Sequence, residues 1–474
     1  MSATSAVLGP RLVIGGVASG VGKTTIATGL LAALTARGTK AAGAKIGPDF
    51  IDPGYHTLAC GRPPRNFDSW LCGPEAIAPL AQRAGLGADI LVIEGVMGLF
   101  DGAADGTPSS TADIAAQLRA PIVLVVDAAA LSASVAAIVH GFRDHDPRIL
   151  VAGVALNCVG SPTHEQLLRE AIAPLSIPVL GCLHRDDGLL WRDRHLGLVP
   201  VAEQPGRVRA SLAQLAAHIA DGFDLDAIET IARSAPGIQA GNVAKPARVG
   251  SCRIAVAAGP AFTFSYTDNL ETLEAAGAEL IPFDPVSVPA LPDDVDGLIA
   301  GGGFPEVHGE ALTANRPLLA DVARRIADGL PTWAECGGLL WLADRLDGRP
   351  MVGAIPTSAH LTERLVLGYR HAESLVPSPI GPSGTTLRGH EFHYSTCEPG
   401  GDAVRLTSRF KTSVDGFATP TLLATYLHHH AGGDPSVVER FVRTCVGSAL
   451  SIRGRRSGWP PLGEPAQDPS TPAP

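Results

Sequence analysis

The chain has 474 residues, of which 45% are hydrophobic and 18% are charged. Its length exceeds what one ordinary core accommodates and predicts two domains of about 200 residues each, while its composition excludes a wholly disordered chain. The formal net charge of −10 excludes a surface built to coat nucleic acid or to anchor on an anionic membrane, so neither partner is expected.

The cysteines and the N-terminus indicate the cellular compartment in which the protein works. The eight cysteines are far apart and form no C-x-x-C pair, which favours a reducing, cytoplasmic setting. Residues 1–16 lack the features of an export signal. Residues 121–142 have the length of a membrane span, but Asp127, Ser132 and Ser134 interrupt them, so a buried strand leading into a helix is predicted instead.

Short apolar runs alternate with helical segments in the first half of the chain. The runs span residues 11–17, 88–96, 121–128, 149–157 and 178–183. Runs that are apolar on both faces are typical of parallel strands covered by helices. The first predicted helix has one apolar face, formed by Ile26, Leu30, Leu31 and Leu34. This pattern predicts a doubly wound α/β domain over residues 10–233.

The motif GVASGVGKTT, residues 16–25, lies between the first strand and the first helix. Its glycines allow backbone amides to face a phosphate at the helix N-terminus, where Lys23 adds a charge and Thr24 a hydroxyl for Mg²⁺. Five residues instead of four separate Gly16 from Gly22, so this is a variant of the Walker loop. A nucleotide site is predicted, with contacts from Gly20, Val21, Gly22, Lys23, Thr24 and Thr25.

Acidic residues follow the predicted strands, at the edge where open α/β sheets bind ligands. Glu94 is a candidate magnesium ligand, and a solvated loop carboxylate is the alternative; Asp101 follows it. Loops rich in mixed charge are typical of functional sites, although such residues also stabilise turns. Residues 44–73 form such a segment, with Asp49, Asp52, His56, Arg62, Arg65 and Asp68.

The second half of the chain has its own pattern. Residues 234–250 lose periodicity and collect Pro, Gly and Ala, which predicts a linker. A second α/β pattern begins at residues 253–259 and predicts a domain over residues 251–450. Residues 454–474 are too rich in proline and too poor in apolar residues to fold alone, so a disordered tail is predicted.

Cys336 lies between a predicted strand and a predicted helix and precedes Gly337 and Gly338. This setting predicts a tight turn that exposes the thiol, at a helix N-terminus that lowers its pKa toward the reactive thiolate. The other cysteines are interpreted as small buried hydrophobes. Another predicted strand ends in three glycines, and the amides of Gly302 and Gly303 are candidate donors to an oxyanion.

Three adjacent histidines, His428, His429 and His430, follow a further strand. Alone, they are consistent with a metal patch or with ordinary exposed residues. Because Cys336 and the glycine-rich strand end belong to the same predicted domain, a catalytic role is favoured.

Nine motifs occur along the chain in the same order as in a known family. They are GVASGVGKTT, KIGPDFIDPGYH, FDSWL, EGVMGLFDG and RHLGL, followed by GGGFPE, AECGGLLWL, GHEFHYS and YLHHH. By these motifs, residues 10–450 resemble the cobyrinate or hydrogenobyrinate a,c-diamide synthase family. The resemblance implies two doubly wound α/β domains: a dethiobiotin-synthetase-like ATP domain, in which the lengthened phosphate loop is typical, and a class I glutamine amidotransferase domain.

The resemblance also implies site roles. Cys336 would attack the glutamine amide with His428 as its base, and His430 stands where ordinary triad glutaminases have glutamate, so no residue that orients His428 is predicted. ATP would bind with Mg²⁺ held by Thr24 and Glu94, with Asp49 as a further candidate, and Asn157 would contact adenine. The acceptor would be a corrin polycarboxylate, amidated at its a and c acetates through acyl phosphates. Its candidate contacts are Asp49, Asp52, Tyr55, His56 and Asp101.

Two positions depart from the family pattern: Phe50, where tyrosine is common, and Ala431, where an aromatic residue is usual. A cobyric acid synthase, which amidates other side chains, is the nearest rival interpretation, and GPDFIDPGYH and FDSWL argue against it. A switch-type ATPase and a degenerate binding module are rival interpretations from different functional classes. The Ala-, Gly- and Arg-rich composition is typical of a GC-rich genome, and organisms with such genomes often insert cobalt late, so hydrogenobyrinate is favoured over cobyrinate. The oligomeric state is left open between a monomer and a homodimer.

Overall fold

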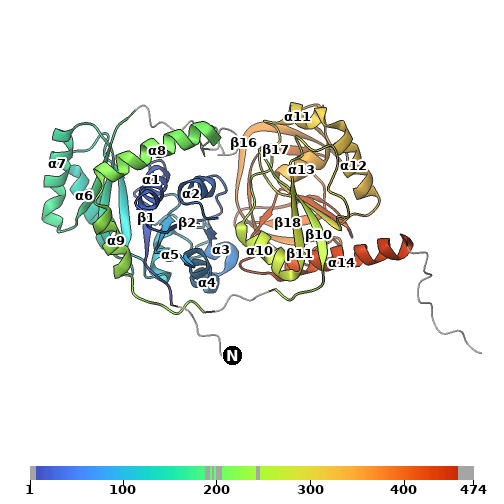
Figure 1. Cartoon of the computed structure of the whole chain (residues 1–474), viewed down its shortest axis with the longest axis horizontal. Helices are drawn as coiled ribbons and strands as arrows, with labels where there is room; N and C mark the ends of the chain where they lie inside the picture. Colours follow the sequence, from blue (N-terminus) through green and yellow to red (C-terminus); the bar gives the residue numbers. More distant parts are fainter. Residues whose placement is uncertain are drawn as a thin grey trace, which may run out of the picture.

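The computed structural model describes residues 7–63, 65–186, 193–194, 197–198, 205–241 and 246–456. It has two α/β domains side by side, with the first domain in blue to green and the second in yellow to red (Figure 1). Part of the RHLGL motif, residues 195–196, and the predicted tail from residue 457 onward lie outside the described residues.

A seven-stranded parallel sheet forms the centre of the N-terminal domain. Its strands lie in the order β3 (Arg65–Phe67), β2 (Ala41–Ile46), β4 (Ile90–Glu94), β1 (Arg11–Gly16), β5 (Ile122–Asp127), β6 (Val151–Val159) and β7 (Val179–His184). Beyond this sheet, β8 (Asp193–Arg194) pairs with β9 (Gly197–Leu198). The strands predicted from the apolar runs are confirmed, including β5 within residues 121–142.

Helices cover both faces of this sheet, as the doubly wound pattern predicts. One face carries α1 (Lys23–Ala36), α2 (Asp52–Cys60), α8 (Pro205–Gly222) and α9 (Leu225–Ser234). The other carries α3 (Ser69–Cys72), α4 (Pro74–Gly85), α5 (Thr111–Gln117), α6 (Ser134–Asp144) and α7 (Pro162–Ile172), and a short 3₁₀ turn, Ala173–Leu175, follows α7.

Helix α1 differs from the one-faced amphipathic helix that its sequence predicts. The structure buries almost its whole length. The reason is that α8 packs on the side of α1 that would otherwise face solvent. At Gly29 the two helices approach so closely that a Cβ would lie 2.6 Å from a side-chain carbon of Ile219. The first helix after the phosphate loop is therefore held on both sides, which fixes the loop before it.

The C-terminal domain contains a second doubly wound unit. Its sheet has the order β11 (Ala278–Phe283), β10 (Cys252–Ala257), β12 (Gly297–Ala300), β13 (Thr332–Glu335), β21 (Leu422–Thr425) and β20 (Phe417–Thr419), in which only the β20–β21 pair is antiparallel. Its helices are α10 (Thr267–Ala276), α11 (Gly309–Ala314), α12 (Arg316–Ala327), α13 (Gly337–Leu342) and α14 (Ser436–Arg456). Helix α14 extends past residue 454, where the sequence predicted the tail to begin.

This domain also has a second, mostly antiparallel sheet that the sequence did not predict. Its order is β15 (Arg349–Pro350), β14 (Ala343–Leu346), β16 (Ile355–Ser374), β17 (Thr386–Glu398) and β22 (His428–His429), and β18 (Val404–Thr407) joins β16 to β19 (Thr412–Asp415). Strands β16 and β17 lie on the side of the domain that faces the N-terminal domain (Figure 1).

Buried ion pairs and hydrogen bonds join the two domains. Arg65 from β3 contacts Asp268 in α10, with an Nη1–Oδ1 distance of 2.6 Å, and Arg83 contacts the same carboxylate at 2.9 Å. The Tyr369 hydroxyl donates to Asp68 Oδ2 at 2.7 Å. Because these polar groups are largely removed from water, each depends on its partner across the boundary, and the pairs fix one relative placement of the domains.

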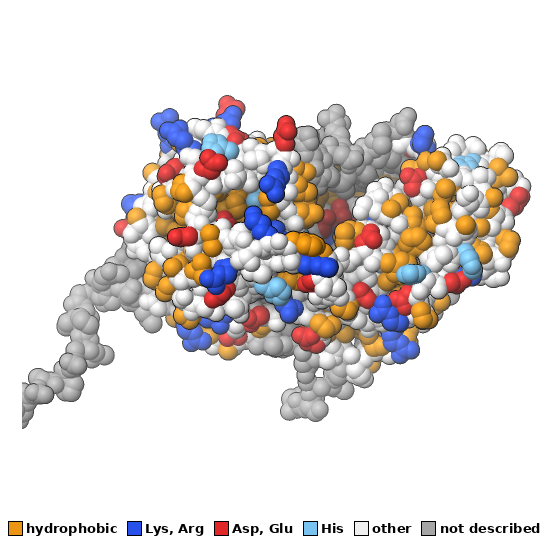
Figure 2. Space-filling model, turned by 180° about the vertical axis from the view of Figure 1, so that it is seen from behind, with side chains coloured by type: hydrophobic (Ala, Val, Ile, Leu, Met, Phe, Trp, Pro, Cys, Tyr) orange, Lys and Arg blue, Asp and Glu red, His pale blue; other side chains and the backbone are white. Residues whose placement is uncertain are grey.

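The ends of the predicted linker are attached to different domains. Near its start, the Pro236 and Ile238 carbonyls accept hydrogen bonds from Arg11 and from the Leu8 amide. Near its end, the Ala247 amide donates to Glu439 in α14. Lys/Arg and Asp/Glu side chains are interspersed on the face shown in Figure 2. None of the helices among the described residues is long and apolar enough to cross a membrane.

Candidate active sites

The phosphate loop connects β1 to α1, as predicted. Gly20 and Gly22 have φ values of 77° and 95°, a region that favours glycine. A Cβ at Gly22 would lie 2.1 Å from Asn157 Nδ2, and this nitrogen donates to the Val21 carbonyl at 3.0 Å. Asn157, at the end of β6, therefore holds the loop in place. A contact from Asn157 to adenine remains a prediction.

Lys23 and Thr24 begin α1, and Thr25 follows them half-buried in its first turn. The Lys23 Nζ donates to the Ala18 carbonyl at 2.9 Å, so the ammonium lies within the loop. The Thr24 hydroxyl donates to Glu94 Oε1 at 2.6 Å. Burial, followed by repulsion from Lys45, lowers the pKa of Lys23 to about 8. The lysine is thus protonated at neutral pH and loses its proton in mildly alkaline solution.

This pKa predicts a pH dependence of nucleotide use. We expect kcat/KM for ATP to fall as the pH rises through about 8, because the free enzyme then loses the charge that binds phosphate. Arginine stays charged in this range, so Lys23→Arg should move the fall to higher pH whatever its absolute rate. Initial rates at saturating acceptor and ammonia give the profiles. Identical profiles for both proteins would refute the assignment.

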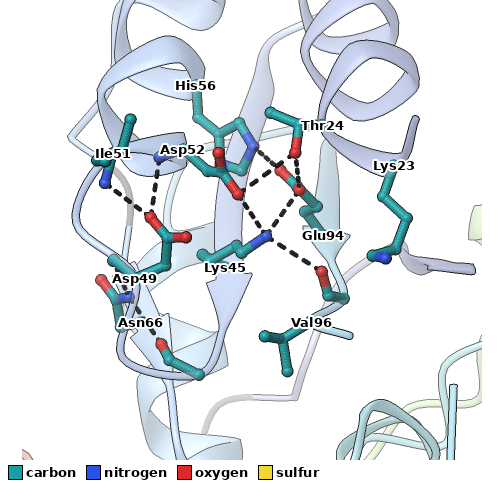
Figure 3. Close-up of polar contacts among 12 residues, drawn as sticks. Lys23, Thr24, Lys45, Asp49, Ile51, Asp52, His56, Asn66, Glu94 and Val96 are labelled. Atoms are coloured by element: carbon teal, nitrogen blue, oxygen red, sulfur yellow. Dashed lines mark hydrogen bonds and ion pairs between the residues drawn. The ribbon is translucent and has the colours of Figure 1, made fainter. Parts of the chain in front are cut away.

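A buried polar cluster lies beside Thr24 (Figure 3). Lys45 Nζ from β2 lies 2.6 Å from Asp52 Oδ2 and 2.7 Å from Glu94 Oε1, and His56 Nε2 lies 2.7 Å from Glu94 Oε2. Although burial opposes the charge on each group, the two carboxylates raise the pKa of Lys45 above its ordinary value. Lys45 and His56 hold the pKa of Glu94 well below its ordinary value. Glu94 is therefore ionised.

Sequence reasoning missed Lys45, although a signal was available. It is the one charged residue in the strand AAGAKI, next to the end where ligands of open sheets bind. A lysine there is costly unless carboxylates surround it. With its side chain only 4% exposed, Lys45 joins the loop after β2 to the end of β4.

The oxygen atoms around Thr24 fit Mg²⁺. Mg²⁺ in nucleotide sites is held by one or two carboxylates together with phosphate oxygens and water. Thr24 Oγ1 has Glu94 Oε1 at 2.6 Å and Asp52 Oδ2 at 3.3 Å. Within the described residues, no group of three His, Cys, Asp or Glu side chains is placed to hold a metal. This donor set therefore suits a metal that is bound together with the nucleotide.

Asp49 differs from its predicted place at the metal. Its Oδ1 accepts hydrogen bonds from the amides of Ile51 and Asp52, at 2.7 Å and 3.0 Å. The carboxylate stabilises the start of α2, and the structure brings Asp52 rather than Asp49 to Thr24. Asp49 also lines a cleft between the domains, which is consistent with its other predicted role, at the substrate.

The structure places two other predicted substrate contacts away from open space, so their contact with the substrate stays a prediction. Tyr55 is 2% exposed and packs in an apolar cluster with Ile51 and Phe264, because α2 turns this side chain toward the domain boundary. His56 is fully buried and contacts Glu94, so it orients the carboxylate. Asp101 accepts a hydrogen bond from the Gly98 amide at 2.8 Å. Its charge acts on Lys23, which places it near the phosphate loop.

Cys336 occupies the sharp turn predicted between β13 and α13. Its φ of 48° is in the left-handed region, which is rare for a residue with a side chain and typical of functional turns. Two glycines permit the close approach of β12: a Cβ at Gly337 would lie 2.9 Å from the Gly303 nitrogen, and one at Gly338 would lie 2.0 Å from the Ala300 carbonyl oxygen.

The predictions that the turn exposes the Cys336 thiol and that its pKa is lowered are both wrong for this structure. Cys336 is 4% exposed. Burial, followed by repulsion from Glu306, raises its pKa well above the ordinary value. Removal from water disfavours the thiolate more than the short helix α13 favours it. The thiol is therefore neutral, and catalysis requires a base that removes its proton.

His428 lies beside this turn. A Cβ at Gly302 would lie 2.4 Å from His428 Cε1, so the histidine, the glycine-rich end of β12 and the Cys336 turn converge. The Gly302 amide donates to the Phe264 carbonyl at 3.2 Å. As an oxyanion donor, Gly302 would have to break this bond, so its predicted role is less favoured. The Gly303 amide, next to Gly337, is the better candidate.

Glu335 is the functional candidate that sequence reasoning missed in this domain. Its Oε2 lies 3.6 Å from His428 Nδ1, beyond hydrogen-bond distance, and this nitrogen has no hydrogen-bond partner among the described residues. Its Oε1 accepts from the His429 amide at 3.2 Å. Its position immediately before the nucleophile was the available signal. His429 Nδ1 donates to the Arg388 carbonyl, and His430 Nδ1 lies 3.3 Å from Cys72 Sγ. The three histidines therefore have separate contacts and do not form a metal patch.

We infer that the nearby Glu335 carboxylate orients His428 and stabilises its protonated form during catalysis. Glu335→Gln should therefore reduce kcat for glutamine hydrolysis by about 10-fold to 100-fold. Hydrolysis is measured as glutamate released, over a range of pH. A shift of the pH profile as well as a lower rate is expected, since a merely structural role would lower the rate alone. Synthesis with added ammonia should continue. Unchanged hydrolysis would contradict the role given to Glu335.

Two family models match the chain, one in each domain. The CobQ/CobB/MinD/ParA nucleotide binding domain matches residues 12–198. The CobB/CobQ-like glutamine amidotransferase domain matches residues 253–436. These matches coincide with the phosphate loop and the Cys336 turn, respectively.

Curated relatives match nearly the whole chain. The hydrogenobyrinate a,c-diamide synthase of Streptomyces coelicolor is 46% identical over 92% of this chain and 97% of the relative. That of Thermobifida fusca is 45% identical over 91% and 96%. The cobyrinate a,c-diamide synthase of Synechococcus sp. is 41% identical over 92% and 98%. At this identity and coverage, the chain belongs to the hydrogenobyrinate and cobyrinate a,c-diamide synthase family and is an amide-forming ligase with a glutamine amidotransferase domain.

Proposed function

We propose that the protein uses ATP and glutamine to amidate the a and c acetate carboxylates of a corrin, hydrogenobyrinate or cobyrinate. The names of its relatives support this substrate class. The observation that carries the proposal is that the two sites share one boundary. Phe50, from the loop after β2, has its ring centroid 4.8 Å from that of His428, so the loop beside the nucleotide site contacts the glutaminase base directly.

In the N-terminal domain, a corrin carboxylate oxygen attacks the γ-phosphorus of ATP, ADP leaves, and an acyl phosphate forms. Lys23 and the loop amides stabilise charge on the transferring phosphoryl group. Thr24, Glu94 and Asp52 would hold Mg²⁺, which when bound neutralises charge on the phosphates. Ammonia then attacks the acyl carbon, phosphate leaves, and the nitrogen loses a proton to give the amide.

In the C-terminal domain, His428 takes the proton of the Cys336 thiol as the sulfur attacks the side-chain amide carbon of glutamine. Gly303 donates to the oxyanion. The proton passes to the leaving nitrogen, ammonia departs, and water hydrolyses the thioester to glutamate. Glu335 orients His428 throughout. Because ammonia is largely protonated and unreactive in neutral water, the contact between the domains favours direct transfer.

An experiment can identify which of the two macrocycles is the preferred substrate. The relatives named above as hydrogenobyrinate synthases are 45–46% identical, whereas the cobyrinate synthase is 41% identical, so we propose hydrogenobyrinate as the preferred substrate. The protein is given ATP, Mg²⁺ and glutamine with each macrocycle, kcat/KM is compared, and amides are counted by mass spectrometry. Two amides on hydrogenobyrinate are expected. No amide on either macrocycle would refute the proposal.

We further propose that the protein works in the cytoplasm. Its eight free cysteines support a reducing setting. Light scattering of the purified protein decides between a monomer and the homodimer left open by the sequence.

A further inference from the structure

A cleft of about 610 Å³ lies between the domains, within the range of small-molecule sites. The N-terminal domain lines it with residues 48–51, Trp70, residues 96–97, residues 102–105 and Ser109. The C-terminal domain lines it with Phe264, residues 367–371, His390, Phe392 and residues 407–410. Apart from Phe264, which precedes α10, the second group belongs to the antiparallel sheet and to the turn between β18 and β19. We call this space the interdomain cleft.

The interdomain cleft adjoins both sites. Its lining residue Phe50 contacts His428. On the nucleotide side, the lining residue Asp49 accepts a hydrogen bond from the Asp52 amide. Gly98, next to the lining residue Met97, lies beside Val17 of the phosphate loop, since a Cβ added at Gly98 would be at contact distance, 3.4 Å, from the Val17 carbonyl oxygen. A carboxylate at the inner end of the cleft would therefore lie between the phosphate loop and the source of ammonia.

The walls of the interdomain cleft suit a flat apolar ring. Trp70 and Tyr369 stack at 4.6 Å between ring centroids, and Phe50 and Phe392 add further apolar surface. At the outer end, Phe410 is 79% exposed. Aromatic faces next to an open cleft favour stacking against a macrocycle.

Charged groups in the lining differ in whether they have an oppositely charged partner. Asp105 and Asp49 accept hydrogen bonds from neutral donors: Asp105 from Trp70 Nε1 at 2.7 Å and from the Thr107 amide, and Asp49 from the amides of Ile51 and Asp52. Arg370 is paired with Glu391 at 2.5 Å. Arg409, by contrast, donates to the Ala104 carbonyl oxygen across the cleft, a partner that leaves its charge uncompensated.

A buried polar atom of the lining also lacks a partner. His390, 6% exposed, has no hydrogen-bond partner at Nδ1 within the part of the chain that the structure describes. A ligand that carries several carboxylates would satisfy both an uncompensated guanidinium and an unpartnered ring nitrogen.

We propose that the glutamine amidotransferase domain forms part of the corrin site and that Arg409 binds a peripheral carboxylate of the macrocycle that is not being amidated. This inference rests on the proposed function and extends it, since it places recognition of the acceptor on both domains. Arg409 then selects the polycarboxylate and aligns its ring, whereas the chemistry takes place at the inner end of the cleft.

The test compares Arg409→Gln with Lys411→Gln. Both changes remove one positive charge from the same turn, but Lys411 does not line the cleft. Arg409→Gln should raise KM for hydrogenobyrinate by about 10-fold to 100-fold, the effect of losing one charge-assisted hydrogen bond, with KM for ATP unchanged. Lys411→Gln should match the wild type. Arg409→Lys should restore part of the affinity.

The dependence of KM on ionic strength distinguishes substrate recognition by Arg409 from a purely structural role of its hydrogen bond to Ala104. KM for hydrogenobyrinate should rise with salt in the wild type and less steeply in Arg409→Gln, because one ionic contact is missing. If Arg409→Gln keeps the wild-type KM and salt dependence while the wild type makes the diamide, this inference is wrong and the proposed function stands. If the wild type amidates neither macrocycle, both fail.

Discussion

Cys336→Ala is expected to abolish glutamine-driven amidation, with a loss on the order of 10⁴-fold or more, because no other group can form the thioester. With added ammonia the variant should still form the diamide at a rate close to that of the wild type, since the nucleotide site is in the other domain. Glutamate release and diamide formation are measured in parallel. This pair of results would show that the two reactions are separable in one chain.

Cys397→Ser is a suitable control for this variant. Cys397 is buried in the same domain and contacts the Tyr426 hydroxyl, a contact that serine can keep. It should retain glutamine-driven synthesis. The nucleophile assignment is wrong if Cys336→Ala continues to use glutamine, and the proposed independence of the sites is wrong if it no longer uses ammonia.

Lys23→Ala should give the reciprocal result. Removing the phosphate-binding charge is expected to lower ATP-dependent synthesis by about 10²-fold to 10³-fold with either nitrogen donor, because both routes need the acyl phosphate. Phosphate release in the presence of corrin gives the rate. Lys40→Ala serves as the control, since Lys40 is an exposed lysine between α1 and β2. If Lys23→Ala makes the diamide from ammonia at the wild-type rate, the assignment of the nucleotide site to this loop is wrong.

Much of the fold could be predicted because its strands are apolar on both faces. Such runs located β1, β4 and β5 and the strands around Cys336, and the glycines identified both turns. The order of the strands explains why Thr24 and Glu94 meet, since β1 and β4 are neighbours. The C-terminal ends of parallel strands lie at the same edge of a sheet. Motifs that follow such strands can therefore be predicted to lie close together from the sequence alone.

The remaining features depend on tertiary contacts. His56 and Tyr55 belong to the same motif, yet α2 turns one toward Glu94 and the other into an apolar cluster. The pKa of Cys336 depends on how much protein covers it, which a local glycine pattern does not reveal. The antiparallel sheet was missed because β16 mixes polar and apolar residues over its 20 residues, and it supplies one wall of the interdomain cleft.

The burial of Cys336 has a consequence for survival in the cell. Peroxides and alkylating metabolites react with thiolates that they can reach. Cys336 is 4% exposed and its thiol keeps its proton, so it is neither an accessible group nor a thiolate. An enzyme between turnovers would then resist inactivation at the residue it most needs, and its sensitivity to oxidants would arise only while glutamine is being hydrolysed.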